Sequence, residues 1–476
     1  MIRAYDVATV RAAEQVALAG LPDDALMQRA AAGLATAVLR LLADVGRPAY
    51  GARVLLLVGA GDNGGDALLA GARLAGRGAR VEAVLTAGRA HEVGLAALRA
   101  AGGRVVASPG GADVVVDGLL GIGGRAGLTG AAAELVKALP SSAPVVAVDL
   151  PSGIDPETGE LAGTHVVADL TVTFGAAKPA LLLPPAAGAA GRVEVVDIGL
   201  ALGEPAVERL ETADLAARWP VPGASDDKYR RGVLGVVAGG PAYTGAAVLC
   251  TGAAVRAGAG MVRYVGPAAA SDLVRARWPE VVPGPGRIQA WLVGPGLDPA
   301  GEQRDAAEQA LASGLPCVVD AGGLDLLPPR CEVPTLITPH AGELARLLQA
   351  RGDDVQRADV EAAPLRHARR AAALTGATVL LKGALTLVVG ADGPVRSQAD
   401  GPHWLATAGS GDVLAGIAGA LLAAGLSPLD AGTLAVAVHG AAGHLASRGG
   451  PLSASSVLDA VPDAVARLLR HGPRER

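Results

Sequence analysis

Residues 53–85 read RVLLLVGAGDNGGDALLAGARLAGRGARVEAVL, and this stretch decides the fold of the first half of the chain. An apolar run at 53–58 is followed by a glycine-rich turn, an Ala- and Leu-rich segment of helical length and a second apolar run at 80–85. Such alternation is typical of parallel strands joined by crossover helices. The stretch therefore predicts a strand, a helix and a second strand parallel to the first.

The same alternation continues on both sides of this stretch. Further strands are expected in DVVVDGLLG (113–121), PVVAVDLPSG (144–153) and RVEVVDIGL (192–200), and two Ala-rich helical segments, 7–19 and 24–45, precede them. Strands that alternate with helices build a parallel sheet covered on both faces. The first half is therefore predicted to be a Rossmann-like three-layer α/β sandwich.

The composition changes near residue 205. Residues 205–230 are charged and contain proline, and a new apolar strand begins at Val233. The second half again alternates strands with helices, the last of which are expected to start near Ser410 and Asp430. We therefore expect an α/β domain at 1–204, a linker at 205–230 and a second α/β domain at 231–476.

The composition excludes several classes of protein. Of the 476 residues, 51% are hydrophobic, 18% are charged and 2% are aromatic, and the net charge is −5. No long cluster of Lys and Arg offers a binding surface to nucleic acid, and the most apolar run, from Val413, is too short to cross a bilayer. The start of the chain is amphipathic and lacks the pattern of a signal peptide. We expect a cytoplasmic enzyme with no membrane or nucleic-acid partner.

The three cysteines, Cys250, Cys317 and Cys331, support the same compartment. Their number is odd and their spacings are unrelated. A disulfide framework or a zinc site would show paired spacings. We expect inert thiols in a reducing cytosol.

The first-half motif GAGDNGGD satisfies the dinucleotide pattern Gly-x-Gly-x-x-Gly, and Glu82 lies where a ribose-binding acid belongs. Asp62 and Asp66, however, lie where a pyrophosphate should bind and would repel it. A hard cation held by the oxygen of Asn63 and by the strand-end carboxylate of Asp117 would resolve this conflict. Ligand sites of doubly wound sheets form at the carboxyl ends of strands, so these side chains are expected to converge.

Two further segments carry candidate chemistry. Asp149 ends an apolar strand and enters the turn Pro151–Gly153, so it is a candidate acid or base, although it could simply cap that turn. The loop GIGGRAG at 121–127 can bring backbone N–H groups against phosphates, or it can be a flexible start of the crossover.

These motifs, in this order, resemble the NAD(P)H-hydrate epimerase domain over residues 5–200. The family usually has Asn where Asp62 stands and Gly where Ala67 stands. The resemblance implies that Asp149 is the acid/base, that Asn63, Asp117 and Ser152 bind K⁺, and that Lys178 helps to neutralise phosphate unless it is a solvated strand-end lysine. It also implies that the hydrated dinucleotide contacts Asp149 and two loops, made of Asp62, Asn63, Gly64, Gly65 and Asp66 and of Gly121, Ile122, Gly123, Gly124, Arg125, Ala126 and Gly127.

The segment LATAGSGDVLAGIAGALLAAG (405–425) is the strongest local signal in the second half. Gly409, Ser410 and Gly411 free several N–H groups at the start of a long apolar helix, which makes an anion-binding site. Asp412 beside that site is suited to act as a base next to a transferring phosphate. Its alternative role is that of an ordinary residue at a helix start.

This arrangement resembles the ribokinase-like superfamily. Together with VGPGL, TPHAGELARLL and LLKGALTLV it looks like the ADP/ATP-dependent NAD(P)H-hydrate dehydratase over residues 225–465, which implies a ribokinase-like α/β domain. By that resemblance Gly296, His340 and the catalytic Asp412 contact the hydrated dinucleotide. The adenine nucleotide is expected along Pro402–Gly411 and next to Lys382, Gly383, Ala384, Leu385, Thr386, Ala408, Gly409, Ser410 and Gly411. Glu343 is expected either near Mg²⁺ or as a helix N-terminal acid.

The leading hypothesis is a two-domain metabolite repair enzyme. The first half would interconvert the R and S hydrates of NADH and NADPH, with K⁺, and the second would dehydrate the S hydrate at the expense of ADP or ATP, with Mg²⁺. Homo-oligomers are possible. The alternative is a vitamin or sugar kinase fused to a dinucleotide-binding regulatory module.

Overall fold

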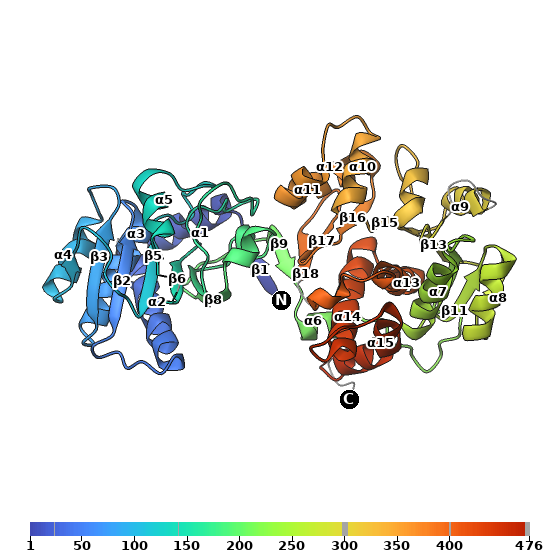
Figure 1. The fold of residues 1–476 in the computed structure, drawn as a ribbon, viewed down its shortest axis with the longest axis horizontal. Helices are drawn as coiled ribbons and strands as arrows, with labels where there is room; N and C mark the ends of the chain where they lie inside the picture. Colours follow the sequence, from blue (N-terminus) through green and yellow to red (C-terminus); the bar gives the residue numbers. More distant parts are fainter. Residues whose placement is uncertain (23, 141, 298–302, 399–400, 472–476) are drawn as a thin grey trace. The chain divides into compact units, whose positions relative to one another are not determined.

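The computed structural model describes residues 1–22, 24–140, 142–297, 303–398 and 401–471 (Figure 1). The chain divides into two compact units, one formed by Arg3–Val207 and the other by Met1–Ile2 together with Glu208–Arg476. The interval 205–230, expected to be a linker, contains strand β9 (Val207–Arg209) and helix α6 (Thr212–Arg218). The limits of the functional domains stay a prediction.

The N-terminal unit is a seven-stranded parallel sheet with helices on both faces. The strand order is β4-β3-β2-β5-β6-β7-β8, and every adjacent pair is parallel. Its strands are β2 (Arg53–Val58), β3 (Arg80–Leu85), β4 (Arg104–Val105), β5 (Val114–Gly118), β6 (Val145–Val148), β7 (Leu170–Phe174) and β8 (Arg192–Val196). Its helices are α1 (Val7–Leu18), α2 (Ala25–Asp44), α3 (Asp62–Ala75), α4 (Glu92–Ala100) and α5 (Gly130–Lys137).

Side chains of β2 alternate between the two faces of this sheet. Val54, Leu56 and Val58 pack in one cluster with α2 and α3, while Leu55 and Leu57 pack in a second cluster with α5. Alternation with a period of two follows from the pleat of a strand. Both faces are thus buried under helices, and the predicted Rossmann-like three-layer arrangement is confirmed.

The strand order of the N-terminal sheet reverses between β2 and β5. The loops that follow these two strands touch, because Gly59 N donates to Gly118 O at 3.0 Å and a Cβ at Gly59 would collide with the carbonyl oxygen of Leu119. Ligands of open α/β sheets bind in the crevice at such a reversal. The fold therefore brings the two glycine-rich loops to one edge of the sheet.

The sheet of the C-terminal unit has the strand order β18-β17-β16-β15-β14-β13-β10-β11-β12. Strands β1 (Ile2–Ala4) and β9 lie at the limits of the two units. The pairs from β12 to β16 are parallel, and β16–β17 and β17–β18 are antiparallel. Its remaining strands are β10 (Val233–Val237), β11 (Met261–Tyr264), β12 (Val282–Pro283), β13 (Ala290–Val293), β14 (Cys317–Val319), β15 (Thr335–Ile337), β16 (Thr378–Leu381), β17 (Thr386–Val389) and β18 (Val395–Gln398). Its helices besides α6 are α7 (Thr244–Arg256), α8 (Ala268–Arg277), α9 (Gln303–Leu311), α10 (Ala341–Gln349), α11 (Arg357–Ala362), α12 (Pro364–Thr375), α13 (Ser410–Ala423), α14 (Pro428–Ser447) and α15 (Ala454–Leu469).

The sequence analysis missed helix α15, since it expected the unit to finish with the helices at Ser410 and Asp430. Pro462 lies inside α15, and a proline in a helix interior removes one backbone hydrogen bond and argues locally against a helix. Burial compensates for this loss, because Val457, Leu458 and Val461 pack into the main core. Tertiary packing therefore overrides the local signal.

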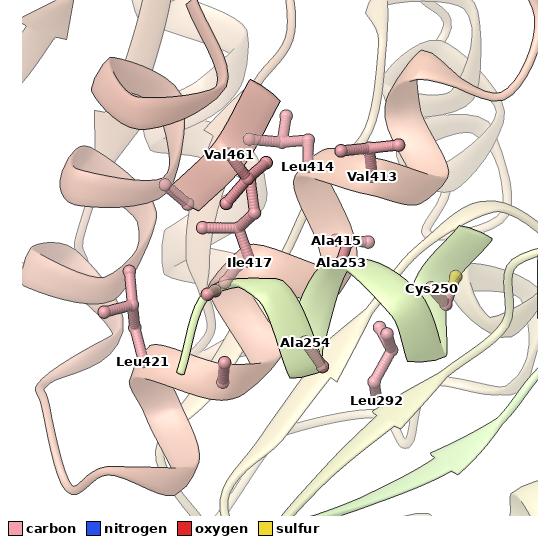
Figure 2. Close-up of a cluster of buried hydrophobic side chains, with 14 of the residues drawn as sticks. Cys250, Ala253, Ala254, Leu292, Val413, Leu414, Ala415, Ile417, Leu421 and Val461 are labelled. Carbon is pink, nitrogen blue, oxygen red and sulfur yellow. The ribbon is translucent and has the colours of Figure 1, made fainter. Parts of the chain in front are cut away.

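Helix α13 is buried along most of its length and crosses α7 (Figure 2). Cys250, Ala253 and Ala254 of α7 face α13, and Leu292 of β13 lies beneath. The two helices approach closely at Gly416, where a Cβ would collide with the carbonyl oxygen of Cys250. The apolar run that begins at Val413 is therefore a core helix, as predicted.

One helix in the described part of the chain, α2, is long and apolar enough by length and composition to cross a membrane. Its mean hydropathy is 1.2, at the lower limit for such a helix. Leu34, Val38 and Leu42 of α2 are buried in the core of the N-terminal unit. Packing on the sheet accounts for the apolar character of α2.

The close approach of α13 to α7 predicts a difference between two glycines. Gly416→Val should lower the free energy of unfolding by about 3 kcal/mol, because the added carbons have no room at the helix crossing. Gly245 of α7 has no atom within 4 Å of a Cβ, so Gly245→Ala should be neutral or stabilising by about 0.5 kcal/mol. Chemical denaturation measures both, and equal effects would contradict the packing described.

Candidate active sites

The N-terminal site begins where β2 gives way to α3. Helix α3 starts at Asp62, directly after Gly61, and a Cβ at Gly64 would collide with the carbonyl oxygen of Gly59. Gly59 and Gly64 are therefore required by close backbone contacts, whereas a Cβ at Gly61 would meet nothing within 4 Å. The predicted glycine-rich strand-to-helix turn is present.

Asn63 joins three segments of this site. Its Nδ2 donates to the carbonyl oxygen of Val148 at 2.9 Å, which ties the start of α3 to the end of β6. Its Oδ1 lies against Gly121, where a Cβ would come within 2.7 Å of that oxygen. The loops 62–66 and 121–127 and the end of β6 therefore meet at this side chain.

Asp117 at the end of β5 is completely buried. Its carboxylate accepts hydrogen bonds from Ser152 Oγ at 2.7 Å, Ser152 N at 2.8 Å and Leu119 N at 3.2 Å. Burial raises the pKa of Asp117 to about 6, and the bonds from Ser152 counteract part of that rise. Asp117 thus fastens the turn after β6 to the loop after β5.

Asp149 is buried and forms an ion pair with Lys178. Lys178 Nζ lies 2.5 Å from Asp149 Oδ1, and Thr173 Oγ1 donates to the same oxygen at 2.9 Å. Asp149 has φ of +64°, a left-handed conformation that is costly for a residue other than glycine and is often found at functional sites. Lys178 is 1% exposed, so the alternative that it is a solvated strand-end lysine is wrong.

Further carboxyl groups surround this ion pair. Asp66 is buried, and its Oδ1 has no hydrogen-bond partner in the described part of the chain. Burial and the charges of Asp149, Asp62 and Glu14 raise the pKa of Asp66 well above its usual value. Burial also raises the pKa of Glu14 on α1. The site is therefore acidic and contains a buried carboxyl group that favours its neutral form.

The C-terminal site is a cavity of about 670 Å³ at the carboxyl ends of β14, β15 and β16 and at the start of α13. Its volume lies within the range of sites for small organic ligands. The predicted residues that line it are His340, Lys382, Gly383, Ala384, Thr386, Gly409, Ser410, Gly411 and Asp412. Leu385 and Ala408 belong to the same two loops but are not among the described residues that line the cavity.

Lys382 lies among charged side chains in this cavity. Its Nζ is 2.8 Å from Asp320 Oδ1 and 3.6 Å from Glu343 Oε2. Burial acts to lower the pKa of Lys382, but the negative charges of its neighbours outweigh burial and the pKa is raised. A Cβ at Gly411 would lie 3.6 Å from the same ammonium. Lys382 therefore carries a fixed positive charge beside the first turn of α13.

Asp412 and Ser410 occupy that first turn. Burial, followed by the charge of Asp320, raises the pKa of Asp412 to about 7, while Lys382 lowers it. Gly409 has φ of +83°, which turns the chain sharply into the helix. Ser410 Oγ lies 3.1 Å from Nε2 of the buried His439, and burial lowers the pKa of His439 to about 4. His439 is therefore neutral at pH 7.

His340 caps helix α10. Its Nδ1 accepts hydrogen bonds from the backbone N–H groups of Gly342 and Glu343, at 3.0 and 3.2 Å, and Glu343 Oε2 accepts from His340 N at 2.8 Å. Glu343 is thus a helix N-terminal acid that also faces Lys382.

Gly296 lies at the reversal of strand order between β10 and β13, where its carbonyl oxygen accepts from Gly240 N.

Comparison with known sequences gives the family. The family models for NAD(P)H-hydrate dehydratase and for the YjeF-related protein N-terminus match residues 234–460 and 23–180. The bifunctional NAD(P)H-hydrate repair enzyme of Mycobacterium tuberculosis is 51% identical over 437 residues, which cover 89% of each chain. The chain belongs to the family of bifunctional NAD(P)H-hydrate repair enzymes. The enzyme of Mycobacterium leprae is 47% identical over 98% of this chain and 99% of that one.

A solved structure supports the second half of this assignment to the repair-enzyme family. The ADP/ATP-dependent NAD(P)H-hydrate dehydratase of Bacillus subtilis, co-crystallised with ATP and Mg²⁺, superposes with a TM-score of 0.51 and 26% identity. The match covers 55% of this chain and 99% of that one. The ribokinase-like fold of the second half and the resemblance of both halves to the repair-enzyme family are thus confirmed.

In this member of the repair-enzyme family, sequence reasoning missed Asp320, His439 and Glu14. The sequence could have indicated Asp320, because this residue ends the strand in LPCVVDAGG as Asp117 and Asp149 end theirs. His439 and Glu14 lie within the helices α14 and α1, where the sequence gives no signal of a site. Their contribution depends on which face of each helix meets the site.

The buried ion pair of the N-terminal unit predicts a non-additive effect on stability. Lys178→Met should lower the free energy of unfolding by about 3–5 kcal/mol, because Asp149 is left buried without a counter-charge. The double variant Lys178→Met/Asp149→Asn should recover most of this loss. Lys137→Met, which removes an exposed lysine paired with Glu134, should change stability by less than about 0.5 kcal/mol. Additive single effects in denaturant unfolding would contradict the pairing.

The raised pKa of Asp412 predicts a pH-dependent stability difference. The folded protein binds this proton more tightly than the unfolded chain, so the contribution of Asp412 to stability falls as pH rises from about 4 to about 7. Asp412→Asn does not titrate and should be more stable than the wild type at pH 8, by on the order of 3 kcal/mol, but not at pH 4. Thermal unfolding at both pH values measures this, and a pH-independent difference would show that Asp412 titrates normally.

Proposed function

We propose that this chain repairs hydrated NADH and NADPH by two reactions. The N-terminal unit interconverts the R and S hydrates, and the C-terminal unit dehydrates the S hydrate with ADP or ATP. The observation that carries the proposal is the 51% identity to a bifunctional repair enzyme over 89% of both chains. The alternative, a vitamin or sugar kinase fused to a regulatory module, is not favoured, because the relatives that match both halves are repair enzymes.

In the C-terminal site Asp412 is the proposed base. Hydroxide is a poor leaving group, so Asp412 removes the proton of the substrate hydroxyl while that oxygen takes the terminal phosphoryl group of the nucleotide. Phosphate then leaves with the electrons of the C–O bond, the ring nitrogen supplies its lone pair, and loss of a proton from the neighbouring carbon restores the double bond. A pKa of about 7 suits a base near neutral pH, and Lys382 and the N–H groups at Gly409–Gly411 face the phosphates.

The protein residues of this site do not form a metal cage of their own. Among the described residues no group of three or more His, Cys, Asp and Glu side chains is arranged to hold a metal, and Asp320 and Glu343 both face Lys382. Mg²⁺ binds phosphate oxygens readily. We infer that Mg²⁺ arrives with the nucleotide rather than at a preformed protein site.

In the N-terminal site Asp149 is the proposed acid/base. Epimerisation requires the hydroxyl to leave as water and water to add to the other face of the ring, so one group must deliver and accept a proton. Lys178 and Thr173 hold one oxygen of Asp149. This arrangement fixes the carboxylate at the end of β6, next to the two loops proposed to bind the dinucleotide.

We propose that Asn63, Asp117 and Ser152 hold K⁺. Asp117 is buried, and no cationic side chain of the described chain is paired with it. The side-chain oxygens of Asn63, Asp117 and Ser152 are the ligand type that hard cations prefer. When bound, K⁺ would supply positive charge to offset the acidic residues near the dinucleotide phosphates.

The site of action is proposed from the chemistry of the thiols. Burial raises the pKa of Cys317 to about 12 and that of Cys250 well above its usual value, and all three cysteines are free thiols. Inert free thiols fit a cytoplasmic enzyme that acts on soluble dinucleotides. The expected absence of nucleic-acid and membrane partners, and the possible homo-oligomer, stay predictions.

One assay tests both reactions. NADH hydrated by acid to a mixture of both epimers is incubated with the protein, Mg²⁺, K⁺ and ADP or ATP, and the return of the absorbance of the reduced nicotinamide is followed. Complete recovery is expected. Recovery of the S fraction alone would remove the epimerase assignment, and a stable phosphoester product would favour the kinase.

Two variants serve as controls for each other in this assay. Asp149→Asn should slow recovery of the R fraction by at least 100-fold and leave the S fraction unaffected, because general acid–base catalysis typically contributes 10²–10⁴-fold. Asp412→Asn should slow the recovery of NADH by a similar factor, while the R and S hydrates still interconvert. If both variants lose both reactions, the two sites are not independent.

A further inference from the structure

A second cavity of the C-terminal unit lies outside the proposed active site. It has a volume of about 350 Å³ and is formed by the segment 219–231, the end of α7, the end of α13 and α15. We name it the basic groove and define it by Trp219, Arg230, Arg231, Arg256, Leu421 and Leu469. Helix α13 begins in the active site at Ser410 and reaches the groove with its last turn, roughly 20 Å away at 1.5 Å per residue. The two cavities are therefore distinct.

The walls of the basic groove are apolar. Trp219 and Leu421 are buried core residues whose atoms reach the cavity, and Ala420, Val465 and Leu469 add aliphatic surface from α13 and α15. An apolar cavity of this size can accept one aromatic or aliphatic group. The walls alone therefore favour a ligand with an apolar body.

The charged residues of the groove are mostly positive. Arg230, Arg231 and Arg256 line it together with the single acid Asp226, although the whole chain has a net charge of −5. Asp226 Oδ1 lies 3.9 Å from a terminal nitrogen of Arg230, at the edge of ion-pair distance. Arg256 forms an ion pair with Asp459, whose Oδ1 lies 3.4 Å from a terminal nitrogen of the arginine. The local charge therefore complements an anion.

Arg231 provides a fixed positive charge in the groove. One of its terminal nitrogens donates to the carbonyl oxygen of Gly258 at 2.9 Å, which fixes the guanidinium. Its Nε is buried and has no hydrogen-bond partner among the described residues. Arg231 also lines the groove, so the positive charge of its guanidinium would attract an anionic ligand.

We propose that the basic groove binds a small organic anion with an apolar body, such as an aryl or acyl carboxylate or phosphate. The anionic group lies between Arg230 and Arg231, and the apolar body lies against Leu421, Val465 and Leu469. Binding requires no covalent step and does not involve the residues proposed for either reaction.

The test uses two fluorescent probes that share an aromatic body. 8-Anilinonaphthalene-1-sulfonate carries one negative charge, and N-phenyl-1-naphthylamine carries none. Both are titrated against the full chain in saturating ATP and Mg²⁺, which occupy the proposed dehydratase site. The sulfonate probe is expected to bind at one site and at least tenfold more tightly than the neutral probe. Sulfonate binding that is seen only without ATP and is unchanged in Arg230→Gln/Arg231→Gln would place the probe in the active site and overturn the proposal.

Variants locate the probe. Arg230→Gln/Arg231→Gln should weaken the sulfonate probe by tenfold or more and leave the neutral probe within twofold, because it removes only the charge-assisted contacts. Arg275→Gln removes an exposed arginine outside the groove and should change neither affinity. Equal sulfonate affinity in the double variant and in Arg275→Gln would overturn the proposal.

Two further variants fill the groove or remove the end of the chain. Ala466 is exposed and lines the groove, so Ala466→Trp should fill the groove without disturbing the core and should weaken the binding of both probes at least tenfold.

A chain that ends at His471 should bind the sulfonate probe as the full chain does. Much tighter binding after this truncation would assign the groove to the chain's own last residues and overturn the proposal. Thermal unfolding confirms that each variant is folded.

Discussion

Each unit of this protein holds a lysine against a buried aspartate at the carboxyl end of its sheet, and the rest of each site is arranged around that ion pair. Asp149, which follows β6, forms an ion pair with Lys178 in the turn after β7. Asp320, which follows β14, forms one with Lys382 in the turn after β16. A buried carboxylate without a partner is unstable. The first ion pair therefore holds together the ends of the neighbouring strands β6 and β7, and the second links the ends of β14 and β16 across β15.

The second consequence of these ion pairs is electrostatic. Each leaves another carboxyl group nearby whose charge is not compensated. The charge of Asp149 in the first pair raises the pKa of Asp66. In the second pair, the charge of Asp320 raises the pKa of Asp412 and the charge of Lys382 lowers it. A group whose charged and neutral forms are close in free energy can exchange a proton near neutral pH. The same burial that makes Asp412 costly for folding suits it to proton transfer near neutral pH.

Small residues make these arrangements possible. Aromatic side chains form only 2% of the chain, while glycine accounts for 67 residues. Gly59 and Gly64 allow the start of α3 to touch the neighbouring loop, and Gly416 allows α13 to lie directly on α7. Side chains at these points would push the helix starts away from the strand ends. The packing of small residues thus sets the position of the glycine-rich turns as well as the density of the core.

The sequence by itself determined the class of fold, most strands of both sheets, the two glycine-rich turns and three candidate aspartates, Asp117, Asp149 and Asp412. These features depend on local patterns of apolar residues and glycine, which a single sequence displays. The tertiary structure alone decided that Lys178 is buried against Asp149, that Lys382 joins Asp320 and Glu343, that His439 lies behind Ser410 and that α15 forms despite Pro462. Each of these depends on contacts between residues far apart in the chain, whose burial and charge no local pattern encodes.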